Sequence, residues 1–384
     1  MRPATIPGQA LHRIISVFTV PDTKAIVLGG DHHNTLGVIR ALGQAGILSS
    51  LIILSDGDET PYVSKSRYVS GFKVIKHSAE LPDLLLSDYS SKTLKPVVFC
   101  CHDALASILD LNADKLGHAF ILPRGAIPGS ITELMNKEKM GELARKCGLR
   151  TPPEEGFPCI VKPLVSKDGK KDWMRVCENA EELERCVGLY GRSNLHVQRF
   201  IDKEAEYQLI GCSIPDGKVI IPGVSSILRP CPGSNTSFLH FSGPDTIVES
   251  SPVIDFVHST GYVGLFSVEF VRDKDGTDYF LEMNFRNDGN AVCVVRAGVN
   301  LPLIWYLGAT GQDYSKELDK PVKSLYVVPE FEELSLLTSK TISLKQFFAD
   351  LCKARAGMEF DIKDQKPFWC QLSRRIHHKM NRHA

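Results

Sequence analysis

The stretch that decides the fold runs from Val268 to Asn284 and reads VEFVRDKDGTDYFLEMN. Its Asp275-Gly276 dipeptide lies between two apolar runs, which is the strongest short signal for a β-hairpin with a two-residue type I′ turn. With that dipeptide at the centre of the turn, Glu269 lies directly opposite Glu282 on the neighbouring strand. The sequence therefore predicts a hairpin that brings two carboxylates together.

The predicted hairpin has one polar and one apolar face, because successive side chains of a strand point to opposite faces. The polar face carries Ser267, Glu269, Glu282, Asn284 and Arg286, and the apolar face carries Phe266, Val268, Phe270, Leu281 and Met283. Two opposed carboxylates repel each other, which destabilises the strand pair and raises the pKa of one of them. A divalent cation bound between them would remove this repulsion. Two carboxylates and an amide carbonyl suit Mg²⁺. The alternative is a solvated polar face of an antiparallel sheet.

The composition is that of a globular protein, with 43% of the 384 residues hydrophobic and 23% charged. The 45 basic residues balance the 45 acidic ones, which argues against a protein that coats nucleic acid. No uncharged apolar run approaches the roughly 20 residues that span a bilayer, and the apolar patch Leu11–Val20 is interrupted by His12 and Arg13. We therefore expect a cytoplasmic protein. Its 11 cysteines, an odd number without a Cys-x-x-Cys pair, favour reduced buried thiols.

The first part of the chain alternates short apolar runs with a helical pattern. The runs expected as strands are Ala25–Leu28, Leu51–Leu54, Val97–Cys101 and Phe120–Leu122. Such runs form parallel sheets that are covered on both faces. The Gly29-Gly30 turn after the first run raises the alternative of dinucleotide binding, but the glycine spacing does not fit that motif. The adjacent trio Asp31, His32 and His33 lacks a distant further ligand for a metal ion.

A helix with clear ends precedes the second part of the chain. Asn136 is the expected N-cap, and Gly148 ends the helix before Pro152-Pro153. Strands and hairpins follow, including Tyr207–Ser213 paired with Val219–Ile221. This change of pattern marks the start of a second domain.

The order of these features resembles the ATP-grasp ligases, and most closely the branch of carbamoyl-phosphate-synthase-like and D-aspartate-ligase-like carboxylate-amine ligases. The features in chain order are Lys137, Lys162, Gln198-Arg199-Phe200-Ile201, Glu269, Glu282-Met283-Asn284-Phe285-Arg286 and the tail Arg296–Pro302. The resemblance covers about Lys24 to Tyr314.

The resemblance implies a fold that is both α/β and α+β. A Rossmann-like pre-ATP-grasp domain would span residues 24–130, and an ATP-grasp domain of two α+β subdomains would span 131–315. Residues 1–23 would be an N-terminal extension and 316–384 a C-terminal extension.

The resemblance also implies a role for each predicted site residue. Lys137 and Lys162 would contact the phosphates of ATP as point charges. The adenine would lie against the hinge formed by Gln198, Arg199, Phe200 and Ile201, where Gln198 replaces the usual Glu and keeps a carbonyl acceptor. Glu206 would bind the ribose, with Glu204 as its competitor.

At the other end of the implied nucleotide site, the resemblance agrees with the hairpin register. Glu269, Glu282 and Asn284 would hold Mg²⁺ or Mn²⁺. Arg286 would stabilise charge on the transferred phosphoryl group in the transition state.

The sequence departs from the family at the mobile loop, where residues 166–171 contain a single glycine among lysines. It also lacks the Gln and Glu that biotin-dependent carboxylases carry at Asp288 and Asn290. Those two residues and the loop Arg229–Phe238 are candidates for contacting the acceptor substrate.

Near the C-terminus, apolar residues recur every four positions among basic ones, which predicts an amphipathic helix. The apolar positions are Phe368, Leu372, Ile376 and Met380. Such a helix either packs on its own protein or lies on a membrane surface with Trp369 as an anchor.

We therefore expect an ATP-dependent ligase that joins a carboxylate to an amine through an acylphosphate. Its partners would be those two small molecules and a second copy of the chain in a homodimer, without nucleic acid. The first alternative is a non-catalytic or regulatory module that keeps the nucleotide site. A dinucleotide oxidoreductase is a weaker third hypothesis.

Overall fold

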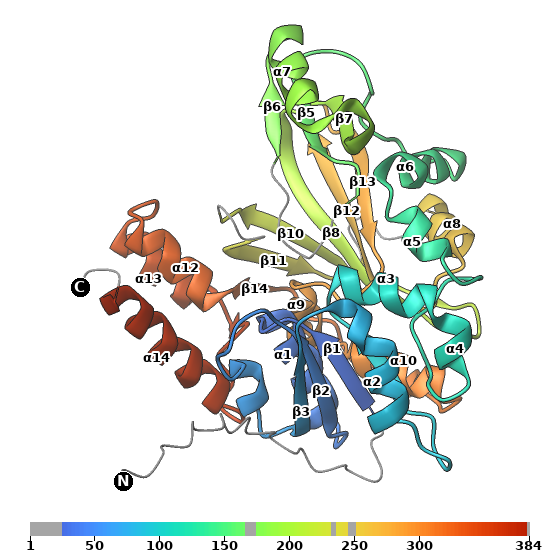
Figure 1. The fold of residues 1–384 in the computed structure, drawn as a ribbon. Helices are drawn as coiled ribbons and strands as arrows, with labels where there is room; N and C mark the ends of the chain where they lie inside the picture. The colour runs from blue at the N-terminus through green and yellow to red at the C-terminus, as the bar shows by residue number, and fades with distance from the viewer. Residues whose placement is uncertain (1–24, 166–173, 232–235, 245–250, 382–384) are drawn as a thin grey trace, which may run out of the picture.

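The computed structural model describes residues 25–165, 174–231, 236–244 and 251–381, and in these residues it contains three β-sheets (Figure 1). The expected N-terminal extension and the loop at 166–171 therefore lie outside the described residues. All 11 cysteines are free thiols, and eight of them are buried as the sequence predicts, whereas Cys147 and Cys370 are partly exposed and Cys352 is exposed.

The first sheet is parallel and has the strand order β3-β2-β1-β4. Its strands are β1 (Ala25–Gly29), β2 (Ser49–Leu54), β3 (Val69–Ile75) and β4 (Val97–Cys100). Alternate residues of β1 enter two different cores, because Val27 packs with helix α1 (His33–Gln44) and Leu28 packs with α2 (Leu81–Asp88) and α3 (Asp103–Leu111). A strand buried on both faces must be apolar throughout, as this one is.

One expected strand of this sheet does not form. Phe120–Leu122 contributes only an isolated parallel bridge between Ile121 and Val97. Pro123 follows directly and has no N–H to extend a ladder, which limits the pairing to this single bridge. The short helix α4 (Ala113–Gly117) connects α3 to this segment.

The main sheet has the strand order β13-β12-β8-β10-β11-β14-β15, with β9 paired to β8. Its central strands are β8 (Lys203–Ser213), β9 (Val219–Ile220), β10 (Val224–Arg229), β11 (Phe238–Ser242), β12 (Gly264–Asp273) and β13 (Asp278–Asn284). The β8–β9 hairpin is the one predicted from the sequence. Two strands from the C-terminal part of the chain, β14 (Leu325–Val328) and β15 (Ala356–Gly357), extend the same sheet.

Three helices cover one face of this sheet: α5 (Ser130–Leu134), α6 (Lys137–Lys146) and α8 (Ser251–Thr260). The Asn136 side chain accepts hydrogen bonds from the backbone N–H groups of Glu138 and Lys139, so it caps α6 as predicted. Gly148 adopts φ 86° beyond the other end of that helix, a conformation that favours glycine.

A small third sheet, β6-β5-β7, stands at the top of the molecule in Figure 1 together with α7 (Ala180–Tyr190). Its strands are β5 (Cys159–Pro163), β6 (Arg175–Cys177) and β7 (Leu195–Arg199). We call this unit the cap subdomain. It has a separate small core that includes Cys159, Val161 and Cys186.

Helices α9 (Ala291–Ala297) and α10 (Leu301–Ala309) lie in the core between the first sheet and the main sheet. Among the described residues, no single helix is long and apolar enough to cross a membrane. The pair α9 and α10 meets the length and composition criteria only jointly, and it is bent by 91°.

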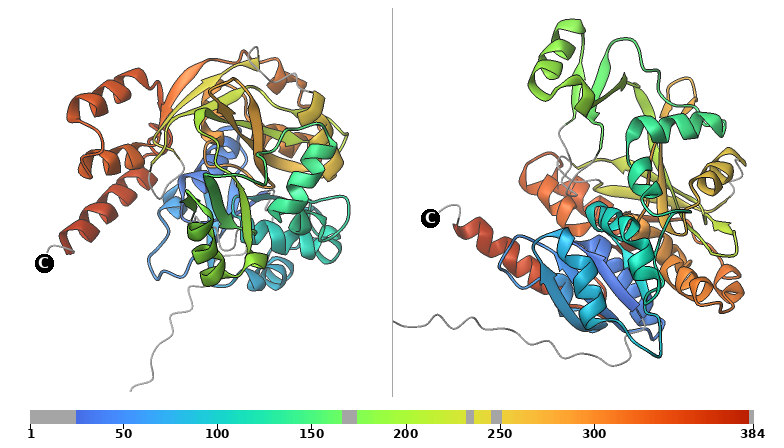
Figure 2. Two further views of the ribbon diagram at one scale, coloured as in Figure 1. Left: turned by 90° about the horizontal axis from the view of Figure 1, so that it is seen from above. Right: turned by 45° about the vertical axis from the view of Figure 1, so that its right-hand side comes forward.

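The C-terminal helices lie along one side of the molecule (Figures 1 and 2). They are α12 (Glu330–Thr338), α13 (Leu344–Lys353) and α14 (Lys366–Asn381), after the short α11 (Ser315–Leu318). The expected amphipathic helix is α14. Its Phe368 ring stacks on Phe331, and its Arg374 forms ion pairs with Asp31 and Glu59, so its first half packs on the protein itself.

Candidate functional site

A cleft of about 380 Å³ lies between the cap subdomain and the main sheet. It is lined by side chains of α6, β5, β7, β8, β12 and β13. The structure places every predicted site residue on its walls: Lys137, Lys162, Gln198, Arg199, Phe200, Ile201, Glu206, Glu269, Glu282, Asn284 and Arg286. Residues separated by up to 149 positions in the chain thus share one concave surface.

The hairpin register that the sequence predicts holds at the carboxylates, although the turn differs from the prediction. Glu269 is paired with Glu282, but Phe270 is paired with Phe280, which leaves Leu281 as an extra residue in β13. The turn has three residues, Lys274, Asp275 and Gly276, instead of the expected two, because Asp273 and Thr277 are the residues that close it: the Asp273 N–H donates to the Thr277 carbonyl. Within the turn, the Gly276 N–H donates to the Asp273 carbonyl, and Gly276 adopts φ 82°. This extra turn residue and the β-bulge at Leu281 shift the register in opposite directions and cancel.

The bulge also corrects one predicted orientation. Leu281 lines the cleft, whereas the alternation from a regular ladder placed it on the apolar core face. The other predicted core residues of the hairpin, Phe266, Val268, Phe270 and Met283, do belong to the core under α6 and α8. A bulged strand opposes two residues to one, so both Leu281 and Glu282 can reach the cleft.

Glu269 lies at the bottom of the cleft, where Oε1 accepts hydrogen bonds from Gln208 Nε2 and Asn284 Nδ2, both at 3.0 Å. Burial, together with the neighbouring Glu282 and Asp288 carboxylates, raises the pKa of Glu269 to about 8. The opposed pair therefore behaves as the sequence argument expects. It is a place where a cation would lower the electrostatic cost.

The Arg286 guanidinium is fixed by two carboxylates that lie far apart in the chain, Asp103 and Asp288. Its Nε is 3.0 Å from Asp103 Oδ1 at the start of α3, and one terminal nitrogen is 3.1 Å from Asp288 Oδ2. The other terminal nitrogen donates to Asn284 Oδ1 at 3.0 Å. Burial opposes the charge, but Asp103 and Asp288 outweigh it and raise the pKa of Arg286, so the guanidinium is cationic and held in one orientation.

The two lysines are both buried at the cleft. Lys137, the first residue of α6, places its Nζ 3.8 Å from Glu282 Oε2. Lys162 lies near the end of β5, and burial lowers its pKa, while the carboxylate of Glu282 partly offsets that effect. Both side chains therefore point their amino groups toward the carboxylate end of the cleft rather than outward to solvent.

The hinge after β7 lies at the other end of the cleft. The backbone N–H groups of Arg199 and Phe200 donate to Pro153 and Pro158. Among the described hinge residues, this leaves the Ile201 N–H for a ligand. Gln198 is buried, and its Oε1 lies 2.7 Å from His196 Nε2, so the predicted acceptor oxygen is already in contact with a histidine. Burial lowers the pKa of His196 to about 4, which makes that imidazole neutral at pH 7.

The structure separates the two candidates for a ribose ligand. Glu206 lines the cleft and forms an ion pair with Lys203, which also lines it. Glu204 is exposed and is not part of the cleft wall.

The predicted acceptor-contacting residues have other partners. Asp288 is buried and accepts from Ser267 Oγ and from the Asn290 backbone N–H. The Asn290 amide donates to Gln208 Oε1 at 2.8 Å. Arg229 forms ion pairs with Glu333 and Asp350 on α12 and α13, and part of the loop that follows it lies outside the described residues.

Sequence reasoning missed Asp103, Gln208 and His196. Asp103 begins α3, three positions after the end of β4, at the carboxyl end of a parallel strand, where ligand-binding residues of α/β sheets gather. That position was a usable signal. Gln208 becomes informative only when β8 is known to pair with β12, which sets it beside Glu269.

No protein-family model matches the chain. The 2-oxoglutarate carboxylase small subunit of Hydrogenobacter thermophilus is 24% identical over 205 residues, which are 47% of this chain and 39% of that protein. The C-terminal section of the carbamoyl phosphate synthase large chain of Methanopyrus kandleri is 22% identical over 223 residues, 51% of this chain and 41% of that protein. The chain thus spans about two fifths of the length of these relatives.

Solved structures resemble the fold over most of the chain. N5-carboxyaminoimidazole synthetase from Staphylococcus aureus has a TM-score of 0.63 at 15% identity, covering 84% of this chain and 86% of that chain. L-amino acid ligase from Bacillus licheniformis has a TM-score of 0.59 at 17% identity, covering 79% of each chain. The biotin carboxylase domain dimer of the Hydrogenobacter enzyme, solved with MgADP and bicarbonate, has a TM-score of 0.60 at 19% identity, covering 79% of this chain and 73% of that chain.

These relatives and structural neighbours are ATP-grasp enzymes. The predicted resemblance is therefore confirmed, and so is the predicted mixed α/β fold with parallel and antiparallel sheets. The Rossmann-like character of residues 24–130 stays a prediction.

Proposed function

We propose that this chain, which has the ATP-grasp fold, is an ATP-dependent ligase that joins a carboxylate to an amine. The observation that carries the proposal is the convergence of two buried lysines, two opposed carboxylates and one fixed arginine on a single cleft. The similarity to ligases and carboxylases of the same fold supports this function.

The cleft has the polarity that a nucleoside triphosphate requires. The hinge offers the Ile201 N–H and the apolar side chains of Phe200 and Leu281 for an adenine ring. Glu206 lines the cleft wall, where its carboxylate would accept hydrogen bonds from the ribose hydroxyls. Lys137 and Lys162 supply positive charge near the carboxylate end, where the phosphates would lie.

The donor set at that end fits a hard divalent cation. Glu269 and Glu282 offer carboxylate oxygens, which are the preferred ligands of Mg²⁺. The amide oxygen of Asn284 is a ligand of the same type, and it would join them after turning away from Arg286, from which it accepts a hydrogen bond. A bound Mg²⁺ or Mn²⁺ would neutralise phosphate charge and lower the pKa of Glu269. The neighbours Gln208 and Ser267 hydrogen-bond to this group and would keep the ligands oriented.

In the proposed reaction, an oxygen of the substrate carboxylate attacks the γ-phosphorus of ATP, and ADP leaves. The resulting acylphosphate is attacked by the amine, which forms the amide, releases phosphate and gives up a proton. Arg286 is placed to stabilise negative charge on the transferred phosphoryl group, because Asp103 and Asp288 hold its guanidinium in one position. The chain thus acts mainly by positioning and by charge neutralisation.

The test is Mg²⁺-dependent release of ADP from ATP, measured across amino acids and small carboxylates paired with amines. We expect one pair of substrates to trigger release and to yield an amide. Glu282→Ala should abolish that release while circular dichroism stays unchanged, whereas Glu133→Ala at an exposed ion pair should not affect it. ADP release by Glu282→Ala at the parent rate would refute the assignment.

A non-catalytic ATP-binding module is the second hypothesis, favoured by the glycine-poor loop at 166–171. It predicts ATP binding without ADP release for every substrate pair. A cytoplasmic location and a homodimer stay predictions, and a related biotin carboxylase domain that forms a dimer agrees with the latter.

A further inference from the structure

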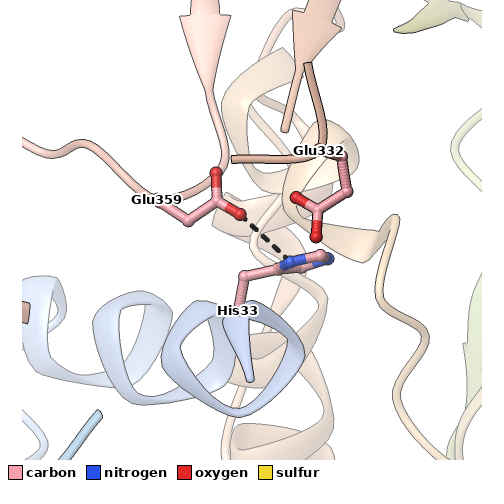
Figure 3. Close-up of side chains that lie close together, drawn as sticks. All are labelled: His33, Glu332 and Glu359. Atoms are coloured by element: carbon pink, nitrogen blue, oxygen red, sulfur yellow. Dashed lines mark ion pairs between the residues drawn. The ribbon is translucent and has the colours of Figure 1, made fainter. Parts of the chain in front are cut away.

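Three side chains of metal-binding types converge outside the nucleotide cleft, at the junction of the first sheet and the C-terminal helices (Figure 3). His33 is the first residue of α1, Glu332 lies on α12, and Glu359 follows β15. Their candidate ligand atoms all lie within 4.8 Å of one another. None of the three lines the cleft.

The spacing within this cluster is close to that of ligands around one ion. His33 Nδ1 lies 3.2 Å from Glu359 Oε1. With metal–ligand distances of about 2.1 Å, two adjacent ligands of a tetrahedral or octahedral ion lie about 3.0–3.4 Å apart. Only the Glu332 carboxylate has to move closer, and Figure 3 shows it directed at the imidazole.

One carboxylate oxygen of the cluster lacks a hydrogen-bond partner among the described residues. Glu332 Oε2 is buried and accepts no hydrogen bond from any residue that the structure describes. Its other oxygen lies 3.9 Å from Arg375, and the side chain as a whole is 12% exposed. An unsatisfied buried carboxylate oxygen is costly, so a buried oxygen without a donor points to a further group bound at this place.

The surroundings carry excess negative charge and hold the ligands in place. Both oxygens of Glu330 accept backbone N–H groups of the Met358–Phe360 segment, which fixes the backbone of Glu359. Around His33, the carboxylates of Glu332, Glu330 and Asp288 are opposed by Arg375. Burial lowers the pKa of His33, which favours the neutral imidazole that binds metals.

We propose that His33, Glu332 and Glu359 form a buried site for a divalent transition-metal ion of the Zn²⁺ type. One imidazole nitrogen with two carboxylate oxygens suits Zn²⁺ or Mn²⁺ better than Mg²⁺ or Ca²⁺, which prefer oxygen ligands throughout. Such an ion would fasten α12 and the segment after β15 to the N-terminus of α1. The sequence alone showed His33 without a distant ligand, and folding supplies two from about 300 residues further along.

The test uses the full chain without a purification tag, carrying Glu269→Gln and Glu282→Gln so that the nucleotide site cannot take up the ion. After treatment with a chelator and dialysis, Zn²⁺ binding is measured by calorimetry and Co²⁺ binding by visible absorption. We expect one equivalent of either ion per chain, and a rise in melting temperature on adding Zn²⁺.

Variants then locate the ion. His33→Asn should weaken binding by about 100-fold or more and abolish the Co²⁺ absorption, and Glu332→Gln should weaken it at least about 10-fold. Glu332→Gln removes no hydrogen bond at Oε2, so it should fold even where His33→Asn does not. His377→Asn, an exposed histidine on α14, is the matched control and should bind like the parent.

Two results would overturn the proposal. One is the absence of a one-equivalent complex in the parent chain. The other is unchanged binding in Glu332→Gln, which would place any bound ion elsewhere, for instance on the thiols.

Discussion

Glu269 and Glu282 face each other across the β12–β13 ladder because Leu281 is an extra residue in β13. Without this bulge, the longer turn at Gly276 would set Leu281 opposite Glu269 and turn Glu282 away. The bulge thus places two carboxylates and an apolar side chain on the same wall of the cleft. Bulges commonly redirect side chains beside active sites, and this one has such an effect.

The opposed carboxylates should make the stability of the metal-free protein depend on pH through Glu269. Its pKa is raised to about 8 from an ordinary value of 4.5, so the folded chain retains a proton that the unfolded chain has lost. As pH rises from about 4.5 to about 8, this group destabilises the fold progressively, and above pH 8 its contribution is constant.

Glu269→Gln cannot ionise and should therefore gain stability relative to the parent as pH rises. We expect the difference in free energy of unfolding to grow by about 1–3 kcal/mol between pH 5 and pH 8.5, measured by urea denaturation with a chelator present. Glu204→Gln, at an exposed position near the start of β8, is the control. An equal difference at both pH values would contradict the raised pKa.

Lys137→Met should weaken ATP binding about 10- to 100-fold, because methionine keeps most of the side-chain volume but removes the charge beside the phosphates. Lys139 lies two positions further along α6, is exposed and pairs with Glu133. Lys139→Met should therefore bind ATP as the parent does. Equal affinities of the two variants, measured by calorimetry, would show that Lys137 does not contact the nucleotide.

Glu206→Gln should raise the KM for ATP several-fold with little change in kcat, because a ribose contact is made equally in the ground and transition states. Glu204→Gln should leave both parameters unchanged, since Glu204 is exposed and does not line the cleft. The kinetics of ADP release would show the reverse pattern if the extra residue in this segment shifted the ribose contact to Glu204.

The parts of the fold that depend on neighbouring residues could be predicted from the sequence. The ends of α6 follow from Asn136 and Gly148, whose capping chemistry is local. The sequence predicts the place of the turn at Asp275-Gly276 but not its length, because a glycine with positive φ suits both a two-residue turn and a turn with one more residue.

The parts that depend on distant pairing could not be predicted. Arg286 is held by Asp103, 183 positions earlier in the chain, and Glu269 is held by Gln208 from another strand. The pairing of β14 with β11 likewise follows from the tertiary packing of α9 and α10, which no local pattern encodes. The two lysines are predicted only because the resemblance supplies an order of residues that spacing alone does not give, whereas the two carboxylates already follow from the hairpin register.

Arg229 binds the C-terminal helices to the main sheet, so its removal should destabilise the protein. One of its terminal nitrogens lies 2.7 Å from Glu333 Oε1 and 2.8 Å from Asp350 Oδ2, and these carboxylate side chains are 0% and 5% exposed. Arg229→Met would leave both of them buried without a cation. The expected loss is about 3–5 kcal/mol in the free energy of unfolding at pH 8.

The same variant should lose less stability at pH 5 than at pH 8. Burial already raises the pKa of Glu333, and Arg229 partly counteracts that effect, so without the arginine the Glu333 carboxyl takes up a proton more easily. Protonation removes the uncompensated charge and with it part of the cost. Arg185→Met, at exposed ion pairs on α7, should change stability by less than about 1 kcal/mol at either pH. A loss in Arg229→Met no larger than in Arg185→Met would mean that α12 and α13 are held to the sheet by their apolar contacts alone.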